Sequence, residues 1–386
     1  MDHDFDPGAE ELRGQLRQLI EETLPEGFLG AFSKDPEDLQ VTQRFCKTLA
    51  AAGLLAIAWP QEFGGRGGSV WEQTVVREEM WAHHEPRGPQ YMGLNWVGPA
   101  IMRFGTPEQQ RLHLPRISDG DVIWCQGFSE PEAGSDLAGL RTRAVPDGEG
   151  WRITGQKVWT SYALIADWCM LAARTSKEDR RQEGITLFML PMDRAGITAR
   201  PIESLLGPHH LNEVFFDDVY VGPDEVLGAV GDGWSVMRDA LAYERVGIAR
   251  YARCERLLSD FRHAKGEEWA GMGEEIRGNW IEALMNARTA RLLAYRAIFQ
   301  QQQNQISDAT ASRARIAVTQ SDQQTADVLG EALGSRLFDD GTVDDAPLHG
   351  AIEDHWRYSQ AATVASGTLE VQLMLVAREL LGTPST

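Results

Sequence analysis

The chain has 386 residues, which is too long for one ordinary hydrophobic core and predicts two or three cooperating domains. Its 57 acidic and 37 basic residues give a formal net charge of -20, which argues against nucleic acid or an anionic membrane surface as a partner. The 4 cysteines stand singly in the sequence, so we expect neither a disulfide framework nor a cysteine-based metal site. No run reaches the roughly 18 apolar residues of a membrane span, and the acidic, amphipathic N-terminal stretch is unlike a signal peptide. We therefore expect a soluble, cytoplasmic protein.

Three stretches of the chain differ in the spacing of their apolar residues. Residues 1–120 carry them three and four apart, which predicts helices. Residues 121–230 contain short β-branched and aromatic runs bounded by Gly, Asp or Pro, such as WRITGQKVW and NEVFFDDVYV, which predict a small antiparallel β domain. The helical spacing returns in residues 231–386. We therefore expect an α+β fold with an N-terminal helical domain, a middle β domain and a C-terminal helical domain, divided near residues 120 and 230.

The helix predicted from residue 234 onward carries a carboxylate among its apolar residues. The residues that share one helical face, at spacings of three and four, are Trp234, Met237, Leu241, Glu244 and Ile248. Burial in such a stripe disfavours the charged form of a carboxylate and raises its pKa. Proteins prepare general bases in this way. A structural ion pair with a nearby arginine is the alternative. The adjacent Arg245 points about 100° away around the helix, so it is not an automatic partner for Glu244.

Four sequence blocks occur in a fixed order: FSEPEAGSD at residues 128–136, ITGQKVWTS at 153–161, GDGWSVMRDALAYERVGIARY at 231–251 and SGTLEVQ at 366–372. Over nearly the whole chain they resemble the acyl-CoA dehydrogenase family of flavoproteins. The resemblance implies an N-terminal helical domain, a middle antiparallel β-barrel-like domain and a C-terminal four-helix bundle. It also implies an oxidoreductase with FAD as cofactor, an acyl-CoA thioester as substrate and an electron-transfer flavoprotein as electron acceptor.

The resemblance also implies which residue is the catalytic base. Most family members carry a glutamate just before a Gly-Thr pair near the C-terminus, where this chain has Ser366. A minority carry the base on the long helix after the β domain, and Glu244 matches that position. The resemblance thus implies that Glu244 removes the α proton of the acyl group, a hydride leaves the β carbon for flavin N5, and the backbone N–H of Ser366 holds the thioester oxygen. Arg245 matches an arginine beside the active site, with an electrostatic role and a plain salt bridge as its two interpretations.

Residues around the flavin are implied in the same way. Phe128 and Ser129 match positions at the pyrimidine edge of the flavin ring, and Ser135 matches a contact to the cofactor or the thioester. Thr368 and Glu370 match cofactor contacts at the start of a helix. The residues that match the segment against the other face of the ring are Trp159, Thr160 and Ser161. A strand tryptophan by itself is more often a core residue, whereas short hydroxyl side chains suit the alternating donors and acceptors of a flavin edge.

In homotetrameric family members, two sequence blocks reach the adenosine half of a neighbour's FAD. Both blocks are altered in this chain. The corresponding regions read RHAKGEEWAGMGEE at residues 262–275 and ADVLGEALGSRLF at 326–338. A similar division occurs in actinobacterial enzymes that act on steroid side-chain thioesters, where two related chains form an α2β2 heterotetramer with one FAD per pair. The resemblance therefore implies one subunit of such a heteromer, with a homo-oligomer as the alternative partner arrangement.

Two further interpretations stay open. One is a non-catalytic FAD-binding partner subunit, and the other is a relative that acts on a carrier-protein thioester or as a flavin oxygenase. We predict no metal site, because the adjacent histidine pairs at His83–His84 and His209–His210 rarely share one metal and no carboxylate spacing accompanies them.

Overall fold

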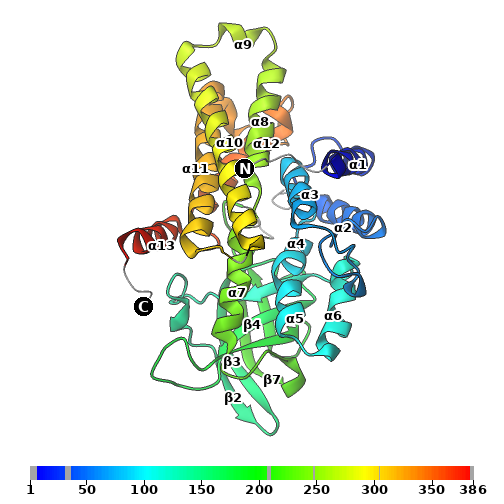
Figure 1. Cartoon of the computed structure of the whole chain (residues 1–386), viewed down its shortest axis with the longest axis vertical. Coiled ribbons are helices and arrows are strands. Elements are labelled where there is room, and N and C mark those ends of the chain that lie inside the picture. The colour runs from blue at the N-terminus through cyan, green and yellow to red at the C-terminus, as the bar shows by residue number, and fades with distance from the viewer. Residues whose placement is uncertain (1–6, 31–35, 207–209, 247, 304, 383–386) are drawn as a thin grey trace. The chain divides into compact units, whose positions relative to one another are not determined.

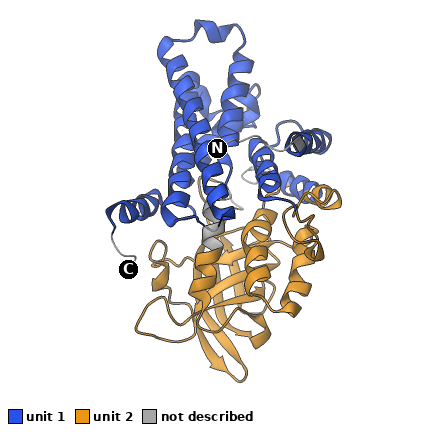
Figure 2. Ribbon diagram, in the orientation of Figure 1, with its two compact units in different colours: residues 1–45, 68–86, 245–386 blue, residues 46–67, 87–244 orange. Residues whose placement is uncertain are grey.

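The computed structural model describes the chain in five stretches, residues 7–30, 36–206, 210–246, 248–303 and 305–382 (Figure 1). The chain forms two compact units, each built from several sequence segments (Figure 2). Unit 1 comprises residues 1–45, 68–86 and 245–386, and unit 2 comprises residues 46–67 and 87–244. No helix in the five described stretches is long and apolar enough to cross a membrane. The division of the chain near residues 120 and 230 stays a prediction.

Unit 1 is helical. Its helices are α1 (Pro7–Thr23), the first part of α2 (Pro36–Ala51), α3 (Val70–Ala82), α8 (Arg250–Lys265), α9 (Glu268–Gly271), α10 (Glu274–Gln302), α11 (Asp308–Leu333), α12 (Ala351–Ala361) and α13 (Leu369–Leu381). Local sequence fixes several of their starts. Ser69 and Glu72 form a capping box at the start of α3, and the Ser307 hydroxyl accepts the Thr310 N–H at 3.1 Å at the start of α11.

Four of these helices share one apolar core. The contributing residues are Leu257, Leu258 and Phe261 of α8, Trp280 and Ala283 of α10, Val328 and Leu329 of α11, and Ala351 and Ile352 of α12. The residues of α8 and α10 recur three or four apart and those of α11 and α12 are adjacent pairs, so each helix turns one side toward this core. This arrangement confirms the four-helix bundle near the C-terminus.

Unit 2 is built around an eight-stranded sheet. The strands are β1 (Trp124–Gly127), β2 (Arg143–Asp147), β3 (Gly150–Ser161), β4 (Trp168–Arg174), β5 (Ile185–Pro191), β6 (Ile197–Pro201), β7 (Leu211–Val221) and β8 (Val226–Leu227). Their order is β6-β7-β3-β2-β4-β5-β8, and β1 pairs with β4. The sheet is mixed, whereas the sequence predicts an antiparallel one, because β1 and β2 both pair with β4 in parallel. Pairings between strands distant in sequence are not dictated by a hairpin turn, so local patterns do not reveal their direction.

Helices of unit 2 come before and after these strands along the chain. They are α4 (Gln90–Met92), α5 (Gly98–Phe104), α6 (Pro107–Ser118) and most of α7 (Gly233–Val246). Gln109 completes a capping box with Thr106 at the start of α6, and its Nε2 donates to the carbonyls of Asp224 and Val226, both at 2.8 Å. One amide thus caps the helix and attaches it to the segment around β8.

Candidate active site

Two of the predicted flavin segments lie side by side in unit 2. Phe128 and Ser129 follow directly after β1, and residues 157–161 form the end of β3. Lys157 Nζ donates a hydrogen bond to the Phe128 carbonyl at 3.0 Å, and the Val158 N–H donates one to the Ser129 carbonyl at 2.9 Å. These two bonds bring the FSEPEAGSD and ITGQKVWTS blocks together.

Trp159 lies at an irregular point of β3. The register of β3 against β7 shifts between Lys157 and Thr160, and Trp159 adopts a φ of 60°. A bulky residue in this left-handed region is strained, and such strain persists only where the surrounding structure fixes it. The side chain is 57% exposed, so Trp159 is not a core residue of the strand. The irregular strand instead holds its indole at the surface of unit 2, one residue beyond the bond between Val158 and Ser129.

Buried polar atoms without partners follow Trp159. Thr160 is buried, and its backbone carbonyl accepts a hydrogen bond from Asn212 Nδ2 at 2.9 Å. Within the described stretches, neither Thr160 Oγ1 nor Asn212 Oδ1 has a hydrogen-bond partner, which is unusual for buried polar atoms and is explained where water or a ligand supplies the partner. Ser161, the last residue of β3, is half-buried.

This part of unit 2 fits the flavin that the resemblance implies. A flavin offers a flat ring face and a polar edge of alternating donors and acceptors. The end of β3 supplies an exposed aromatic side chain and two neighbouring hydroxyl groups, and Asn212 of β7 adds a buried amide oxygen that, like Thr160 Oγ1, has no partner in the described stretches. Phe128 and Ser129 lie within one hydrogen bond of the same strand end. The residues present therefore suit the cofactor by their chemistry.

Ser135 lies in an exposed loop of unit 2 between β1 and β2. The loop is fixed at both ends by the buried Glu130, whose carboxylate accepts the N–H groups of Arg141 at 2.6 Å and Thr142 at 2.9 Å. Next to Ser135, Asp136 forms an ion pair with Arg181 at 2.8 Å. The structure thus holds the loop in place, but it does not test the contact predicted for Ser135.

The remaining predicted contacts lie in unit 1, in the turn before α13. Ser366 and Gly367 both have left-handed backbones, with φ values of 59° and 85°. The φ of Gly367 strains any residue with a side chain, so this position favours glycine. The Thr368 hydroxyl caps α13 by accepting the Val371 N–H at 3.3 Å, and Glu370 lies in the first turn of the helix. These features define the conformation of the turn. The Ser366 N–H needs such a fixed backbone to serve as a hydrogen-bond donor.

The predicted base and its neighbour lie at the end of α7. The structure describes Glu244 and Arg245 by their helical backbone only, and both side chains lie outside the described part of the chain. The roles of Glu244 and Arg245 stay predictions. His209 of the second histidine pair lies outside the described residues as well.

Arg315 is a residue that the sequence did not single out. It is buried in α11, and its Nη2 donates to the carbonyls of Ala362 at 3.2 Å and Ala365 at 2.9 Å, directly before Ser366. A charged donor that bonds two carbonyls stiffens the approach to the turn. No motif surrounds this arginine, and its buried neighbours on the same helix face include the polar Ser312 and Thr319, so the sequence carries no signal for its role.

A second unpredicted group lies in the bundle of unit 1. Cys254, Asp322 and His355 are buried, and their candidate ligand atoms lie within 4.8 Å of one another. However, Asp322 accepts a hydrogen bond from Arg250 Nε at 2.6 Å, which already balances its charge. Burial raises the pKa of the Cys254 thiol, and a protonated thiol is a poor metal ligand. We therefore interpret the group as a buried ion pair with neutral neighbours.

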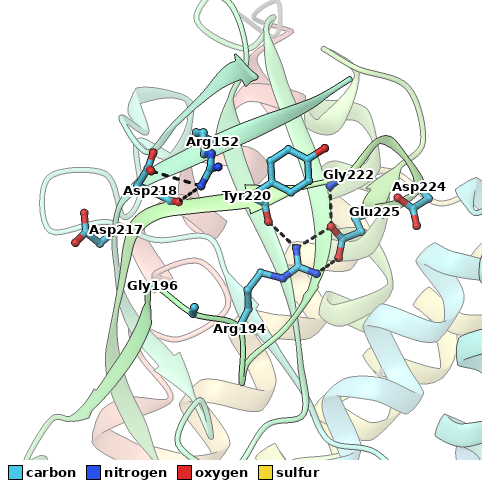
Figure 3. Close-up of a pocket in the computed structure, with 10 residues that line it drawn as sticks. Arg152, Arg194, Gly196, Asp217, Asp218, Tyr220, Gly222, Asp224 and Glu225 are labelled. Carbon is cyan, nitrogen blue, oxygen red and sulfur yellow. Dashed lines mark hydrogen bonds and ion pairs between the residues drawn. The ribbon is translucent and has the colours of Figure 1, made fainter. Parts of the chain in front are cut away.

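A surface hollow of about 620 Å³ lies elsewhere in unit 2 (Figure 3). The two arginines that line it form hydrogen bonds within it: Arg194 bonds both carboxylate oxygens of Glu225 and the Tyr220 carbonyl at 2.7 Å, and Arg152 bonds the Asp218 carbonyl at 3.1 Å. None of the predicted site residues lines it. The hollow is therefore separate from the candidate site.

Family models match the chain in three consecutive parts. They are the acyl-CoA dehydrogenase N-terminal domain at residues 6–121, the middle domain at 125–219 and the C-terminal domain at 231–381.

Individual relatives match over nearly the full length. Acyl-CoA dehydrogenase IpdE1 of Mycobacterium tuberculosis is 35% identical, over 97% of this chain and 98% of that protein. Two solved structures are each 30% identical over 100% of both chains: the Tcur3481-Tcur3483 steroid ACAD, with a TM-score of 0.91, and the ChsE4-ChsE5 complex from Mycobacterium tuberculosis, with a TM-score of 0.87.

Proposed function

The chain belongs to the acyl-CoA dehydrogenase family and is an oxidoreductase acting on acyl-CoA, and from this we propose that it catalyses FAD-dependent α,β-dehydrogenation of an acyl-CoA thioester as one subunit of a heteromer. The observation that carries the flavin part is the contact between residues 128–129 and the end of β3, beside the strained and exposed Trp159. When bound, FAD supplies the acceptor for the hydride that leaves the β carbon of the acyl group. We further propose an electron-transfer flavoprotein as the next electron acceptor.

Glu244 is the general base in this proposal. It lies seven residues, about two helical turns, after Met237, which is buried in unit 2. The Glu244 carboxylate accepts the α proton, and the electrons of that C–H bond form the new C=C bond as hydride leaves the β carbon. The Ser366 N–H donates to the thioester oxygen and stabilises the charge that develops there. Arg245 supports the site electrostatically.

A charge-neutral replacement of the base tests this assignment. Glu244→Gln keeps the size of the side chain but cannot accept the proton, so turnover should fall by about 10²- to 10⁴-fold, while FAD content and the melting temperature stay the same. The assay is reduction of an artificial electron acceptor by the purified protein with acyl-CoA. Asp239→Asn on the same helix is the matched control, because Asp239 forms an ion pair with Arg103 and has no proposed part in the chemistry.

The two interpretations of Glu244 give opposite results. If the carboxylate only forms a structural ion pair, the variant should lose stability and keep its turnover. Normal turnover by Glu244→Gln would also favour a non-catalytic partner subunit.

An apolar surface in unit 1 supports the heteromer. Four large apolar residues on one face of α10 are each at least 40% exposed: Ile281, Met285, Leu292 and Phe299. Large apolar side chains gathered on one exposed face are typical of association surfaces on soluble proteins. Arg288 and Arg296 share this face, so a partner surface with apolar and acidic residues would fit it. We infer that the occupant is a second chain of the same family, because both similar structures named above are complexes of two named chains.

Flavin counting tests the heteromer. We expect little FAD on the chain purified alone, and about one FAD per pair of chains when a paralogous partner chain is co-expressed, because the two blocks for a neighbour's adenosine are altered here. Absorbance of released flavin against protein concentration measures this ratio, and native mass spectrometry gives the assembly. One FAD per protomer in a homo-oligomer would contradict the heteromer while leaving the dehydrogenase proposal intact.

We also propose a steroid-derived acyl-CoA as the substrate class. The support is that one similar structure, at a TM-score of 0.91, is named a steroid ACAD. In the assay above, a steroid side-chain CoA thioester should be turned over faster than a straight-chain acyl-CoA of similar solubility.

A further inference from the structure

Lys157 is a buried charge at the junction of the two flavin segments. Its side chain is 0% exposed in the sheet of unit 2. Nζ donates to Glu130 Oε1 at 2.8 Å and to the Phe128 carbonyl at 3.0 Å. Moving an ammonium and a carboxylate out of water costs several kcal/mol for each ion, and an apolar pair of similar volume is often equally stable there. Stability alone therefore does not explain why this position holds a lysine.

Glu130 extends the contact to a third segment. Its carboxylate also accepts the N–H groups of Arg141 and Thr142, which lead into β2. At this point the backbones are in close contact, because a Cβ on Gly155 of β3 would lie 2.7 Å from Thr142 Cα. One ion pair thus fixes the exit of β1, the entry of β2 and the last part of β3.

The bond to Phe128 connects this pair to the cofactor. The carbonyl that Lys157 holds belongs to a residue predicted to contact the flavin edge, and Trp159 lies two residues further along the same strand. Without that bond, residues 128–129 are joined to β3 by one remaining hydrogen bond within the described stretches, from the Val158 N–H to the Ser129 carbonyl.

We propose that Lys157, paired with Glu130, is a positioning residue for the flavin: it fixes residues 128–129 against the end of β3 in the geometry that binds FAD. This inference rests on the proposed function, because it assumes that these two segments bind flavin. Lys157 acts through the backbone of Phe128 and is not assigned a contact with substrate or cofactor.

Two variants separate positioning from stability. Lys157→Met leaves Glu130 buried without its cation, so it should lower the melting temperature and weaken FAD binding at least about tenfold. The double variant Lys157→Met with Glu130→Gln removes both charges, so its melting temperature without FAD should return most of the way to that of the wild type. Its dissociation constant for FAD should stay raised at least about tenfold, because the bond to the Phe128 carbonyl is still missing.

The experiment uses the whole chain, with its partner subunit where FAD binding needs it. FAD is removed and titrated back, following flavin fluorescence and the fine structure of the visible spectrum, and melting is measured without FAD. Arg152→Met is the control, since Arg152 is an exposed cation of β3 that pairs with Asp147 at 2.7 Å; its FAD affinity should match the wild type.

Recovery of FAD affinity together with stability in the double variant would overturn the proposal, because the pair would then be structural only. An unchanged affinity in a folded Lys157→Met variant would also overturn it. Failure of the wild-type chain to bind FAD, alone and with its partner, would instead contradict the proposed function itself.

Discussion

Two of the residues with strained backbones lie in the predicted site, one in each unit. Trp159 in unit 2 and Ser366 in unit 1 have φ values of 60° and 59°, in a region that costs a non-glycine residue of the order of 1 kcal/mol or more. Each is held by identified contacts: the shifted register of β3 and β7 around Trp159, and the Leu369 N–H bond to the Thr363 carbonyl at 2.9 Å around Ser366. Strain that is fixed in this way is consistent with a backbone preorganised for a ligand.

Trp159 provides a prediction at this scale. Asn tolerates the left-handed region and adds no freedom to the unfolded chain, so Trp159→Asn should leave stability unchanged or raise it by up to about 1 kcal/mol. The same change removes the exposed indole and should weaken FAD binding at least about tenfold, if stacking against the ring is worth about 1.4 kcal/mol or more. Urea unfolding and FAD titration measure the two effects separately.

The control for this variant is Tyr220→Asn, which removes another exposed strand aromatic of unit 2 whose backbone is not left-handed. Tyr220→Asn should lower stability slightly and keep FAD affinity. Trp159→Asn would contradict the flavin assignment if it lost stability and kept its affinity for FAD.

At the scale of elements, the spacing of apolar residues predicts those features of the fold that depend on residues close together in the sequence. Three- and four-residue spacing finds the bundle helices, because each buries one face in the shared core. It does not find the parallel pairing of β1 with β4, which depends on strands far apart in the chain.

The candidate site follows the same rule. Short motifs identify the segments around Phe128 and Trp159, because the residue types of those segments carry the resemblance. The motifs do not reveal that Lys157 and Glu130 join them, or that Arg315 supports the turn before Ser366. Those roles depend on burial and on bonds between distant segments, which only the folded chain brings together.

At the scale of the whole molecule, both units bury histidines that stay neutral. His113 of unit 2 and His355 of unit 1 are at most 4% exposed. Burial, with the neighbouring Arg116, lowers the pKa of His113 to about 4, and burial with Arg253 lowers the pKa of His355 to about 3. In the unfolded chain both titrate near 6.5. As the pH falls below about 6.5, the unfolded chain therefore binds protons that the folded chain does not, and both units lose stability.

His113 allows a test of this acid sensitivity. Its ring packs edge-on against Trp124 and Trp168, with centroid distances of 5.1 and 4.6 Å, so His113→Phe keeps an aromatic contact and removes the titration. Between about pH 6.5 and 4, the free energy of unfolding should fall less steeply in the variant, by up to about 1.4 kcal/mol per pH unit. Urea unfolding followed by tryptophan fluorescence at about pH 7, 6 and 5 measures the slope. An equal slope would contradict the assignment to His113, because carboxylates with a lowered pKa such as Glu79 lose their contribution only below about pH 4.5 and cannot produce a slope between pH 7 and 5.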